Sequence, residues 1–277
     1  CRVGRTGCVL GRARSHSLPP GAFRALIFDV GQGLAVLVET RRHRLVYDVG
    51  ASFGDQFNAA DTVLLPYFRR RGIEHLDKIV ISHGDNDHAG ALPYLLAALE
   101  DTDIISGSSL GQDYSAPTEA CASGRSWQWD GVTFMLMQAE PGYWNNENNR
   151  SCVLRVDNGE SSLLLTGDIE REAEQSLIAQ FSEPLRSDVM VAPHHGSRTS
   201  SSRAFLDRVE PSRVIFTNGY NNRFGHPKQD ILRRYRRLGA EIFTSAEHGA
   251  VNVIAVPGRE LQLQPFRPAR LGYWYRR

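Results

Sequence analysis

Cysteine and long hydrophobic runs are scarce in this chain of 277 residues. The four cysteines are Cys1, Cys8, Cys121 and Cys152. They form no Cys-x-x-Cys pair, which argues against a structural zinc knuckle. Their even number leaves room for one or two disulfides, although their spacing requires neither. No hydrophobic run approaches the length of a transmembrane helix.

The first 20 residues are polar and rich in arginine, and they lack the apolar centre of a signal peptide. This segment runs into Leu18-Pro19-Pro20-Gly21, which is typical of a linker. We expect residues 1–20 to be a linker or upstream tail, as in a piece taken from a longer protein. We expect residues 21–277 to form the folded domain, because 41% hydrophobic content is enough for a sizeable core.

A strong net charge is also missing. Lys and Arg total 32 and Asp and Glu total 31, which gives a net charge of +1. An anionic partner must therefore be bound by local patches of charge. Arginines cluster at residues 69–71 and 233–237, and each cluster is either such a patch or a solvated helix face.

Short β-like runs dominate the first half of the chain, and helices alternate with strands in the second half. We expect strands at residues 23–30, 34–39, 44–48, 78–82, 103–105, 127–129, 132–137, 151–156, 162–166, 188–192, 213–217, 241–244, 250–255 and 260–264. We expect helices at residues 62–71, 92–99, 169–181, 201–208 and 227–238. This order predicts an α/β fold in which two mixed sheets pack together with helices outside, a four-layer αββα sandwich.

Four metal-binding side chains lie on one turn, Ser82-His83-Gly84-Asp85-Asn86-Asp87-His88-Ala89-Gly90. They are His83, Asp85, Asp87 and His88, and they directly follow a predicted buried strand. Folding alone gives no reason to place two histidines and two aspartates within six positions. Imidazole and carboxylate ligands together suit divalent transition metals, so this turn predicts a dinuclear metal site.

Three later segments place similar side chains at strand ends or helix starts. They contain Asp168 after 162–166, His194 and His195 after 188–192, and His226 before a predicted helix. Strand ends at one edge of a sheet converge, which would bring these groups to the first turn. Each also has a structural alternative: a Gly-Asp turn, a surface histidine pair and a helix-start residue. Asp29 and Asp48, each before Val-Gly, are most simply turn formers.

Several of these strings resemble a known family. His83-Gly-Asp-Asn-Asp-His88 is similar to the H-x-H-x-D-H signature of the metallo-β-lactamase superfamily, with Asp85 in the second histidine position. The strings Asp-Val-Gly-Gln-Gly, Asn-Asn-Arg-Ser, Leu-Thr-Gly-Asp, His-His-Gly-Ser and Gly-His-Pro together resemble the carboxyl-terminal domain of ComEC-type DNA-uptake proteins. The likeness covers residues 23–255, most of the chain.

This resemblance implies the metallo-β-lactamase fold and a role in natural transformation. In that family a membrane channel imports one DNA strand, and this domain is thought to degrade the other. The implied partners are DNA and the membrane channel portion of the same full-length protein. The implied location is the periplasmic side of a bacterial inner-membrane protein, with residues 1–20 as the linker. That compartment would permit a disulfide between Cys121 and Cys152.

The resemblance also implies how two divalent metal ions would be held. His83 and Asp85 would bind the first ion, and Asp87 and His88 the second. Asp168 would bridge the two, and His195, preferred over His194, would complete one coordination sphere. Asp87 and Asp168, with His226 beside the phosphate or the leaving group, are the expected catalytic residues.

This chain departs from the superfamily pattern in its middle segment, which carries no ligand histidine. Asn149 or Ser151 occupies that region, either as a substitute ligand or as a support for the ligands. With Asp85 in a histidine position, the site becomes richer in oxygen. Oxygen ligands shift preference from zinc toward manganese or magnesium, so we expect Mn²⁺, with Zn²⁺ or Mg²⁺ as alternatives.

The expected activity is metal-dependent hydrolysis of DNA phosphodiesters. Candidate substrate-binding residues are Ser197, Arg198, Arg203 and Arg223 for phosphate and Tyr143, Trp144 and Tyr220 for base stacking. Two alternatives stay open. One is a hydrolase of a small phosphodiester or a lactone, and the other is a non-catalytic DNA-binding or assembly module of a membrane importer, which the missing middle histidine favours.

Overall fold

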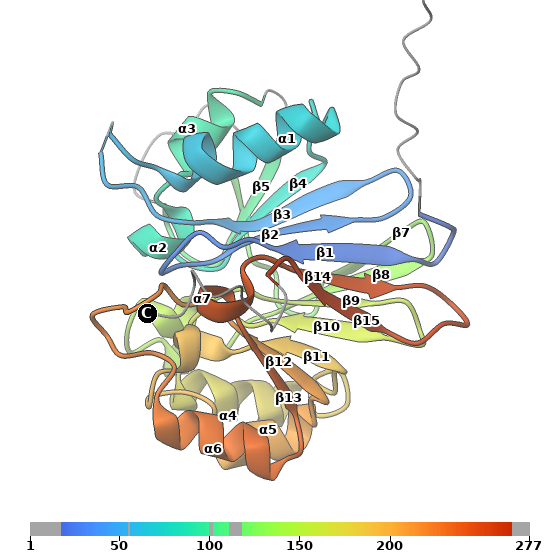
Figure 1. Ribbon diagram of the computed structural model, residues 1–277. Coiled ribbons are helices and arrows are strands. Elements are labelled where there is room, and N and C mark those ends of the chain that lie inside the picture. The colour runs from blue at the N-terminus through green and yellow to red at the C-terminus, as the bar shows by residue number, and fades with distance from the viewer. Residues whose placement is uncertain (1–17, 55, 100–101, 111–117, 268–277) are drawn as a thin grey trace, which may run out of the picture.

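The computed structural model describes residues 18–54, 56–99, 102–110 and 118–267. Within them, two β-sheets pack face to face and helices cover both outer surfaces (Figure 1). The layers follow the order α, β, β, α, which confirms the predicted αββα sandwich. Residues 1–17 of the predicted upstream tail lie outside the described residues.

The first sheet has eight strands in the order β15-β14-β1-β2-β3-β4-β5-β6. Its outer strands on one side are antiparallel, whereas β3, β4, β5 and β6 run parallel. Their bounds are β1 Phe23–Ile27, β2 Ala35–Glu39, β3 Arg44–Val49, β4 Lys78–Ile81, β5 Asp103–Ser106, β6 Thr118–Ala120, β14 Val251–Ala255 and β15 Gln262–Pro265.

The second sheet has seven strands in the order β13-β12-β11-β10-β9-β8-β7. Strands β10 to β13 run parallel, and β7, β8 and β9 join them by antiparallel pairing. Their bounds are β7 Ser126–Trp129, β8 Val132–Met137, β9 Val153–Asp157, β10 Ser162–Leu165, β11 Val189–Val191, β12 Arg213–Phe216 and β13 Glu241–Thr244.

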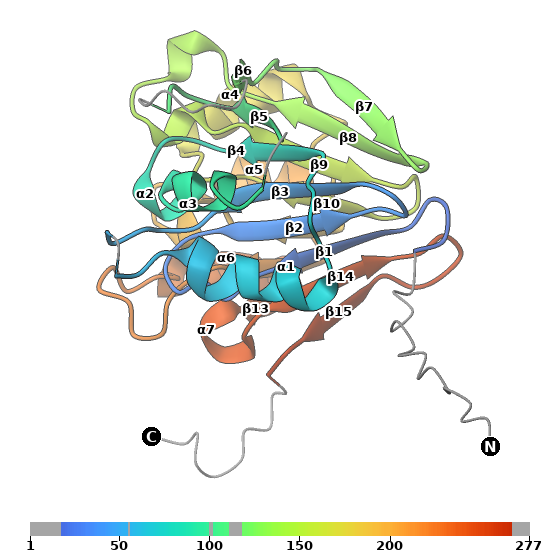
Figure 2. The same cartoon turned by 90° about the horizontal axis from the view of Figure 1, so that it is seen from above.

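Helices cover the outer face of each sheet (Figures 1 and 2). The first sheet carries α1 Leu65–Arg71, which continues a π-helical segment Ala60–Leu64, and α3 Leu92–Leu96. The second carries α4 Arg171–Gln180, α5 Arg203–Val209 and α6 Gln229–Arg237. Short α2 Asn86–Ala89 and α7 Ser245–His248, and 3-10 turns Pro141–Tyr143, Asn148–Arg150 and Pro193–Gly196, lie between the main elements. In the described part of the chain, no helix is both long and apolar enough to cross a bilayer.

Both sheets bury side chains on their two faces, which explains the fully apolar strands. In β10, Leu163 and Leu165 join the core between the sheets, while Leu164 packs under the helices. In β4, Val80 faces the other sheet, and Ile79 and Ile81 pack toward α1 and α3. Because side chains alternate along a strand, such a strand must be apolar at every position.

A disulfide joins Cys121, just after β6, to Cys152, just before β9. It therefore connects an edge of the first sheet to the second sheet. The segment around β6 is a strand paired with β5, which the sequence did not indicate. The predicted helix at 62–71 begins earlier, at Ala60, and the predicted helix at 92–99 ends at Leu96.

Candidate metal centre

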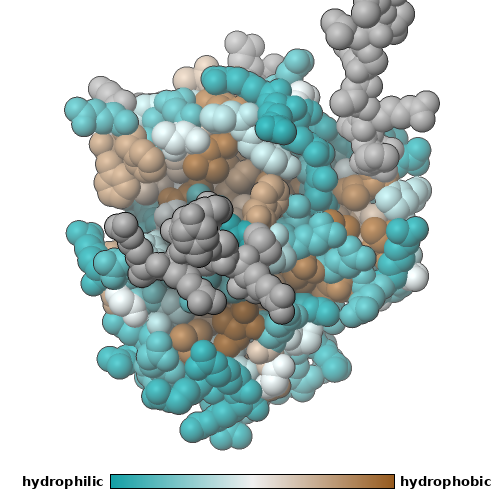
Figure 3. All heavy atoms as spheres, viewed as in Figure 1, coloured by the Kyte–Doolittle hydropathy of each residue, from teal (hydrophilic) through white to brown (hydrophobic). Residues whose placement is uncertain are grey.

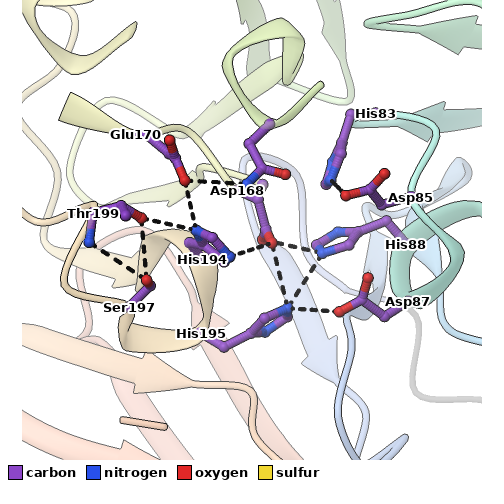
Figure 4. Close-up of polar contacts among 12 residues, drawn as sticks. His83, Asp85, Asp87, His88, Asp168, Glu170, His194, His195, Ser197 and Thr199 are labelled. Atoms are coloured by element: carbon purple, nitrogen blue, oxygen red, sulfur yellow. Dashed lines mark hydrogen bonds and ion pairs between the residues drawn. The ribbon is translucent and has the colours of Figure 1, made fainter. Parts of the chain in front are cut away.

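The carboxyl ends of β4, β10 and β11 meet at one edge of the two packed sheets. His83 follows β4, Asp168 follows β10, and His195 follows β11, so the first sheet supplies one and the second sheet two. Figure 4 shows their side chains pointing toward one another. The turn after β4 also carries Asp87 and His88, whose helix α2 begins directly beyond Asp85.

Four of the predicted ligands form a compact group. One ligand atom from each of Asp87, His88, Asp168 and His195 lies within 4.8 Å of the other three. The His88 Nε2 atom is 3.0 Å from Asp168 Oδ1 and 3.3 Å from His195 Nε2. The His195 Nε2 atom is 3.2 Å from Asp87 Oδ2. His88, Asp168 and His195 are buried, whereas one third of the Asp87 side chain is exposed.

Hydrogen bonds on the far side of each ring set the direction of these histidines. Asp48 is fully buried, and its Oδ2 lies 2.7 Å from His88 Nδ1. The same carboxylate accepts hydrogen bonds from the Ser82 amide, at 2.6 Å, and from the Ser82 hydroxyl, at 2.8 Å. Thr217 Oγ1 hydrogen-bonds His195 Nδ1 at 3.0 Å. Contacts of this kind leave each Nε2 free to point at a metal.

The group is held together by mutual charge. Burial by itself would raise the pKa of Asp168, but the charges of His88 and His195 hold it well below its ordinary value. Burial likewise opposes ionisation of His88, yet Asp168 and Asp48 raise the pKa of that ring well above its usual range. For Asp87, burial is outweighed by the hydrogen bond to His195, and its pKa falls to about 2. A bound cation would replace the protons on these rings, so metal binding should release protons.

Two buried atoms have polar neighbours but no hydrogen bond. Among the residues that the structure describes, His83 Nε2 lies 3.5 Å from Asp85 and Asp168 Oδ1 lies 3.0 Å from His88 Nε2, and neither atom is hydrogen-bonded. Two imidazole Nε2 atoms, on His88 and His195, also face each other at close range. Orphaned polar atoms of this kind are expected where ligands converge on an ion. The residues present therefore fit a divalent metal.

The other half of the predicted site is more open. His83 Nε2 is 3.5 Å from Asp85 Oδ2, and the rings of His83 and His88 lie 4.4 Å apart. The His83 ring is fully buried, but half of the Asp85 side chain is exposed. Two predicted ligands thus lie next to the compact group without belonging to it.

Asn149 and Ser151 support the ligands and do not face them as substitutes. The Asn149 side-chain oxygen accepts a hydrogen bond from the Glu170 amide at 2.8 Å. Ser151 Oγ accepts one from the Asp168 amide at 3.1 Å and lies on the Nδ1 side of His83, away from Nε2. Of the two roles left open by the sequence, ligand and support, the contacts match only support.

The His-His-Gly turn is strained. His194 and His195 both have φ near 51°, in the left-handed region that most side chains avoid. A Cβ atom on Gly196 would lie 2.6 Å from Pro227 and 2.8 Å from Phe216, so only glycine fits there. His194 Nε2 is 3.8 Å from Asp168, and its Nδ1 is 3.3 Å from Glu170. The strain aims both rings at Asp168, and such strain is typical of functional sites.

Residues 29–33, Asp-Val-Gly-Gln-Gly, pack against the turn that carries Asp87 and His88. A Cβ atom on Gly33 would lie 2.5 Å from the carbonyl oxygen of Asp87, so the residue there must be glycine. The Leu34 amide donates to that same carbonyl at 3.0 Å. Asp29, at the start of the string, instead pairs with Arg267 at 2.6 Å.

His226 lies at the rim of the cluster. Its ring centroid is 5.9 Å from that of His194, and its Nδ1 is buried with no hydrogen-bond partner in the described ranges. Burial, followed by the nearby charges of His195 and His194, lowers the pKa of His226 to about 4. The ring is therefore neutral at pH 7. It can donate a hydrogen bond there, but it carries no extra proton that it could transfer to a leaving group.

The predicted substrate-binding residues separate into two groups. Arg223 lines the cleft that borders Asp87, whereas Arg198 pairs with Asp230 at 3.1 Å. Arg203 lies on the outer helical layer, where it pairs with Asp207. Arg198 and Arg203 are thus held by acidic neighbours, so the contacts single out Arg223 as the arginine of the cleft.

Ser197 binds Thr199 within its own turn, and Tyr143 is exposed on a separate 3-10 turn. Trp144 is partly buried against the core of the second sheet, and its Nε1 donates to the Ala139 carbonyl at 2.9 Å. The Arg150 guanidinium lies 5.3 Å from the centroid of its ring.

The sequence did not indicate two polar residues of the site. Asp48 was expected to form a turn, but it holds His88 through a buried carboxylate. Glu170 contacts His194 and accepts hydrogen bonds from Asn146 and Asn148. The sequence signal for Asp48 was its place at the end of a predicted buried strand. Asp29 has the same placement, so this signal does not distinguish the two residues.

Comparison with known proteins agrees with this geometry. The sequence model described as "Metallo-beta-lactamase superfamily" matches residues 28–217. The chain is 35% identical over 238 residues to "Competence protein ComA" of Neisseria gonorrhoeae, covering 86% of this chain and 33% of that protein. It is 35% identical over 251 residues to "Recombination protein 2" of Haemophilus influenzae, covering 90% of this chain and 31% of that protein. The chain thus spans about a third of the length of these curated relatives.

Among solved structures, the metallo-beta-lactamase fold protein YhfI from Bacillus subtilis is similar, with a TM-score of 0.57 at 15% identity. The match covers 84% of this chain and 99% of YhfI, and it bears on the fold alone. Taken together with the match to residues 28–217, these findings show that the chain belongs to the metallo-beta-lactamase superfamily.

Proposed function

We propose that this chain is a metal-dependent phosphodiester hydrolase that acts on DNA. The observation that carries this proposal is the buried group of Asp87, His88, Asp168 and His195, which has room for a cation and borders an open cleft through Asp87. Relatives named for competence and recombination support DNA as the substrate. A further relative, "ComE operon protein 3" of Bacillus subtilis, is 26% identical and points the same way.

In this proposal, His83 and Asp85 would hold one divalent ion, Asp87, His88 and His195 would hold the other, and Asp168 would contribute to both. When bound, the two ions supply an activated water and neutralise charge on the phosphate. Three carboxylates against two dications leave one net positive charge, which favours an anionic substrate. Manganese is the preferred ion, with zinc and magnesium as alternatives, because carboxylates supply half of the six ligands.

His226 takes a supporting role at the phosphate. As a neutral imidazole it donates a hydrogen bond to a phosphate oxygen, while Arg223 contributes positive charge from the same side of the cleft. We expect His226→Ala to lower kcat at least tenfold while the metal content of the purified protein stays the same. Equal loss of metal and activity would instead make His226 a residue that maintains the metal site.

The cellular role we propose is degradation of the strand that is not imported during natural transformation. The domain would then be one part of a larger inner-membrane protein and would face the periplasm beside its channel. The disulfide between Cys121 and Cys152 suits an oxidising compartment.

A second candidate is a DNA-binding or assembly module with little catalysis. One observation favours it: the carboxylate next to His83 is Asp85, half of whose side chain is exposed, and Asn149 and Ser151 are engaged by backbone amides. A module of this kind would bind DNA and at most one metal ion.

A nuclease assay with matched variants separates the two candidates. Plasmid and single-stranded DNA are incubated with chelator-treated protein and added Mn²⁺, Zn²⁺ or Mg²⁺. We expect hydrolysis by the wild type, highest with Mn²⁺, and a loss of at least a hundredfold in Asp168→Asn. Asp103→Asn is the control, because Asp103 lies at the amino end of β5, where it pairs with Lys78. Equal rates in wild type and Asp168→Asn would favour the binding module, and highest activity with zinc would refute the manganese preference.

A further inference from the structure

A cleft of about 550 Å³ opens beside the metal centre, with Asp87 in its wall. Three aromatic side chains, Phe53, Tyr220 and Phe224, also line it. The exposed fractions are 69% for Phe53, 80% for Tyr220 and 45% for Phe224. Soluble domains rarely expose several large rings around one hollow unless a ligand covers them.

The rings come from loops of different sheets. Phe53 lies on the segment after β3 of the first sheet, where it contacts Phe57 with 6.0 Å between ring centroids. Tyr220 and Phe224 lie on the segment after β12 of the second sheet. Both segments project at the same edge of the molecule in Figures 1 and 2. In Figure 3 apolar residues are exposed at that edge, where the segment after β3 projects.

At the floor of the cleft, the loop after β12 contacts the loop after β1. The Gly219 amide donates to the side-chain oxygen of Gln32 at 3.4 Å, so the loop after β1 contacts the loop after β12. A Cβ atom on Gly219 would also lie only 3.1 Å from the Gln32 amide nitrogen. The loop that carries Tyr220 and Phe224 is therefore positioned by packing against the loop after β1 before any ligand arrives, which lowers the entropic cost of binding.

A positively charged side chain, Arg223, also lines the cleft. The Arg223 guanidinium lies over the Phe224 ring, 4.8 Å from its centroid, and both residues line the cleft. The Phe224 ring also stacks with the His226 ring, with 5.7 Å between the ring centroids and 23° between the ring planes. Positive charge, aromatic faces and the metal ligands thus follow one another along a single surface.

We propose that this aromatic cleft binds unstacked nucleobases of a single DNA strand whose adjacent phosphodiester lies at the metal centre. The inference rests on the proposed function and adds the strandedness of the substrate. Every base has a flat π-face, so exposed rings hold bases without regard to sequence. In a duplex those faces are covered by neighbouring bases, so the rings have nothing to stack on. Arg223 adds attraction to the backbone phosphate that joins the bases.

Binding of matched oligonucleotides tests the proposal without requiring catalysis. Fluorescence anisotropy compares a labelled 12-nucleotide oligothymidylate, an abasic strand of the same length and the corresponding duplex, all with Ca²⁺ to limit hydrolysis. We expect the wild type to bind the base-bearing strand about tenfold more tightly than either of the others. In the double variant Tyr220→Ala with Phe224→Ala, this preference should fall to twofold or less.

Phe266→Ala is the matched control, because Phe266 is 60% exposed but does not line the cleft. It should keep the tenfold preference, and thermal melting should show that all variants fold. Equal binding of base-bearing and abasic strands by the wild type, or tighter binding of the duplex, would overturn the proposal. Because these readouts are affinities, a protein that binds bases but hydrolyses no strand would refute the proposed function alone.

Discussion

Asp48 offers the sharpest test of how this metal centre is built. Its Oδ1 accepts the Ser82 amide at 2.6 Å, and its Oδ2 faces both the Ser82 hydroxyl and His88 Nδ1. In Asp48→Asn, the amide oxygen must stay on the Ser82 N–H, so the NH₂ group replaces Oδ2. That group donates to His88 Nδ1, which must then carry a lone pair. The proton moves to Nε2, and a protonated Nε2 cannot bind a metal.

The magnitude follows from what outer contacts of this kind contribute. Loss of a partner behind a ligating histidine weakens metal affinity by about 10- to 100-fold, or about 1.4 to 2.8 kcal/mol. Isothermal titration calorimetry of chelator-treated protein with Mn²⁺ at pH 7 measures the affinity directly. The fold should survive, because the new amide still hydrogen-bonds the Ser82 hydroxyl, and thermal melting checks this.

Asp29→Asn is the natural control. Asp29 also ends a β-strand run and precedes Val-Gly, but it pairs with Arg267 and not with a histidine. We expect its metal affinity to match that of the wild type within about twofold. Unchanged affinity in a folded Asp48→Asn protein would refute the claim that Asp48 sets the proton position on His88.

Two further predictions concern stability. Burial would raise the pKa of Asp130, but hydrogen bonds from Thr40 and Arg42 lower it, so its folded pKa lies below its unfolded value. The carboxylate therefore stabilises the fold above the unfolded pKa of about 4, and this contribution is lost as the pH falls. Urea unfolding of Asp130→Asn should show a loss of about 1.5 kcal/mol at pH 7 that shrinks below pH 4, and a loss constant with pH would contradict this. The disulfide closes a loop across a sequence separation of 31, so replacing Cys121 and Cys152 by serine should lower the free energy of unfolding by about 3 to 4 kcal/mol. An unfolding midpoint that does not respond to reductant in the wild type would exclude that contribution.

Local patterns were sufficient for most of the fold. The buried strands that end before His83, Asp168 and His194 are short apolar runs, and glycine or proline marks the turns that follow them. The ends of helices depended on packing, which decides how far a helix continues. The segment that leads into α1, for example, starts as a π-helix at Ala60, against the buried face of the first sheet.

Long-range contacts decided the roles that the sequence left ambiguous. Trp144 and Tyr220 are both aromatic residues in polar loops, yet one is partly buried against the core and the other is 80% exposed beside the cleft. Nothing within a few residues of either distinguishes them. Phe53 carried no signal at all, because the aromatic residues that share its cleft, Tyr220 and Phe224, lie more than 150 positions away along the chain.

The sequence by itself determined which chemistry this protein carries, because histidines and aspartates were already gathered on the turn from His83 to His88 and at two further strand ends. Tertiary structure alone decided that Asp48, and not Asp29, contacts His88, and that the two aromatic loops line one cleft. The physical reason is that side-chain chemistry is local, whereas the partner of a buried side chain is set by which strands lie next to each other in the packed sheets.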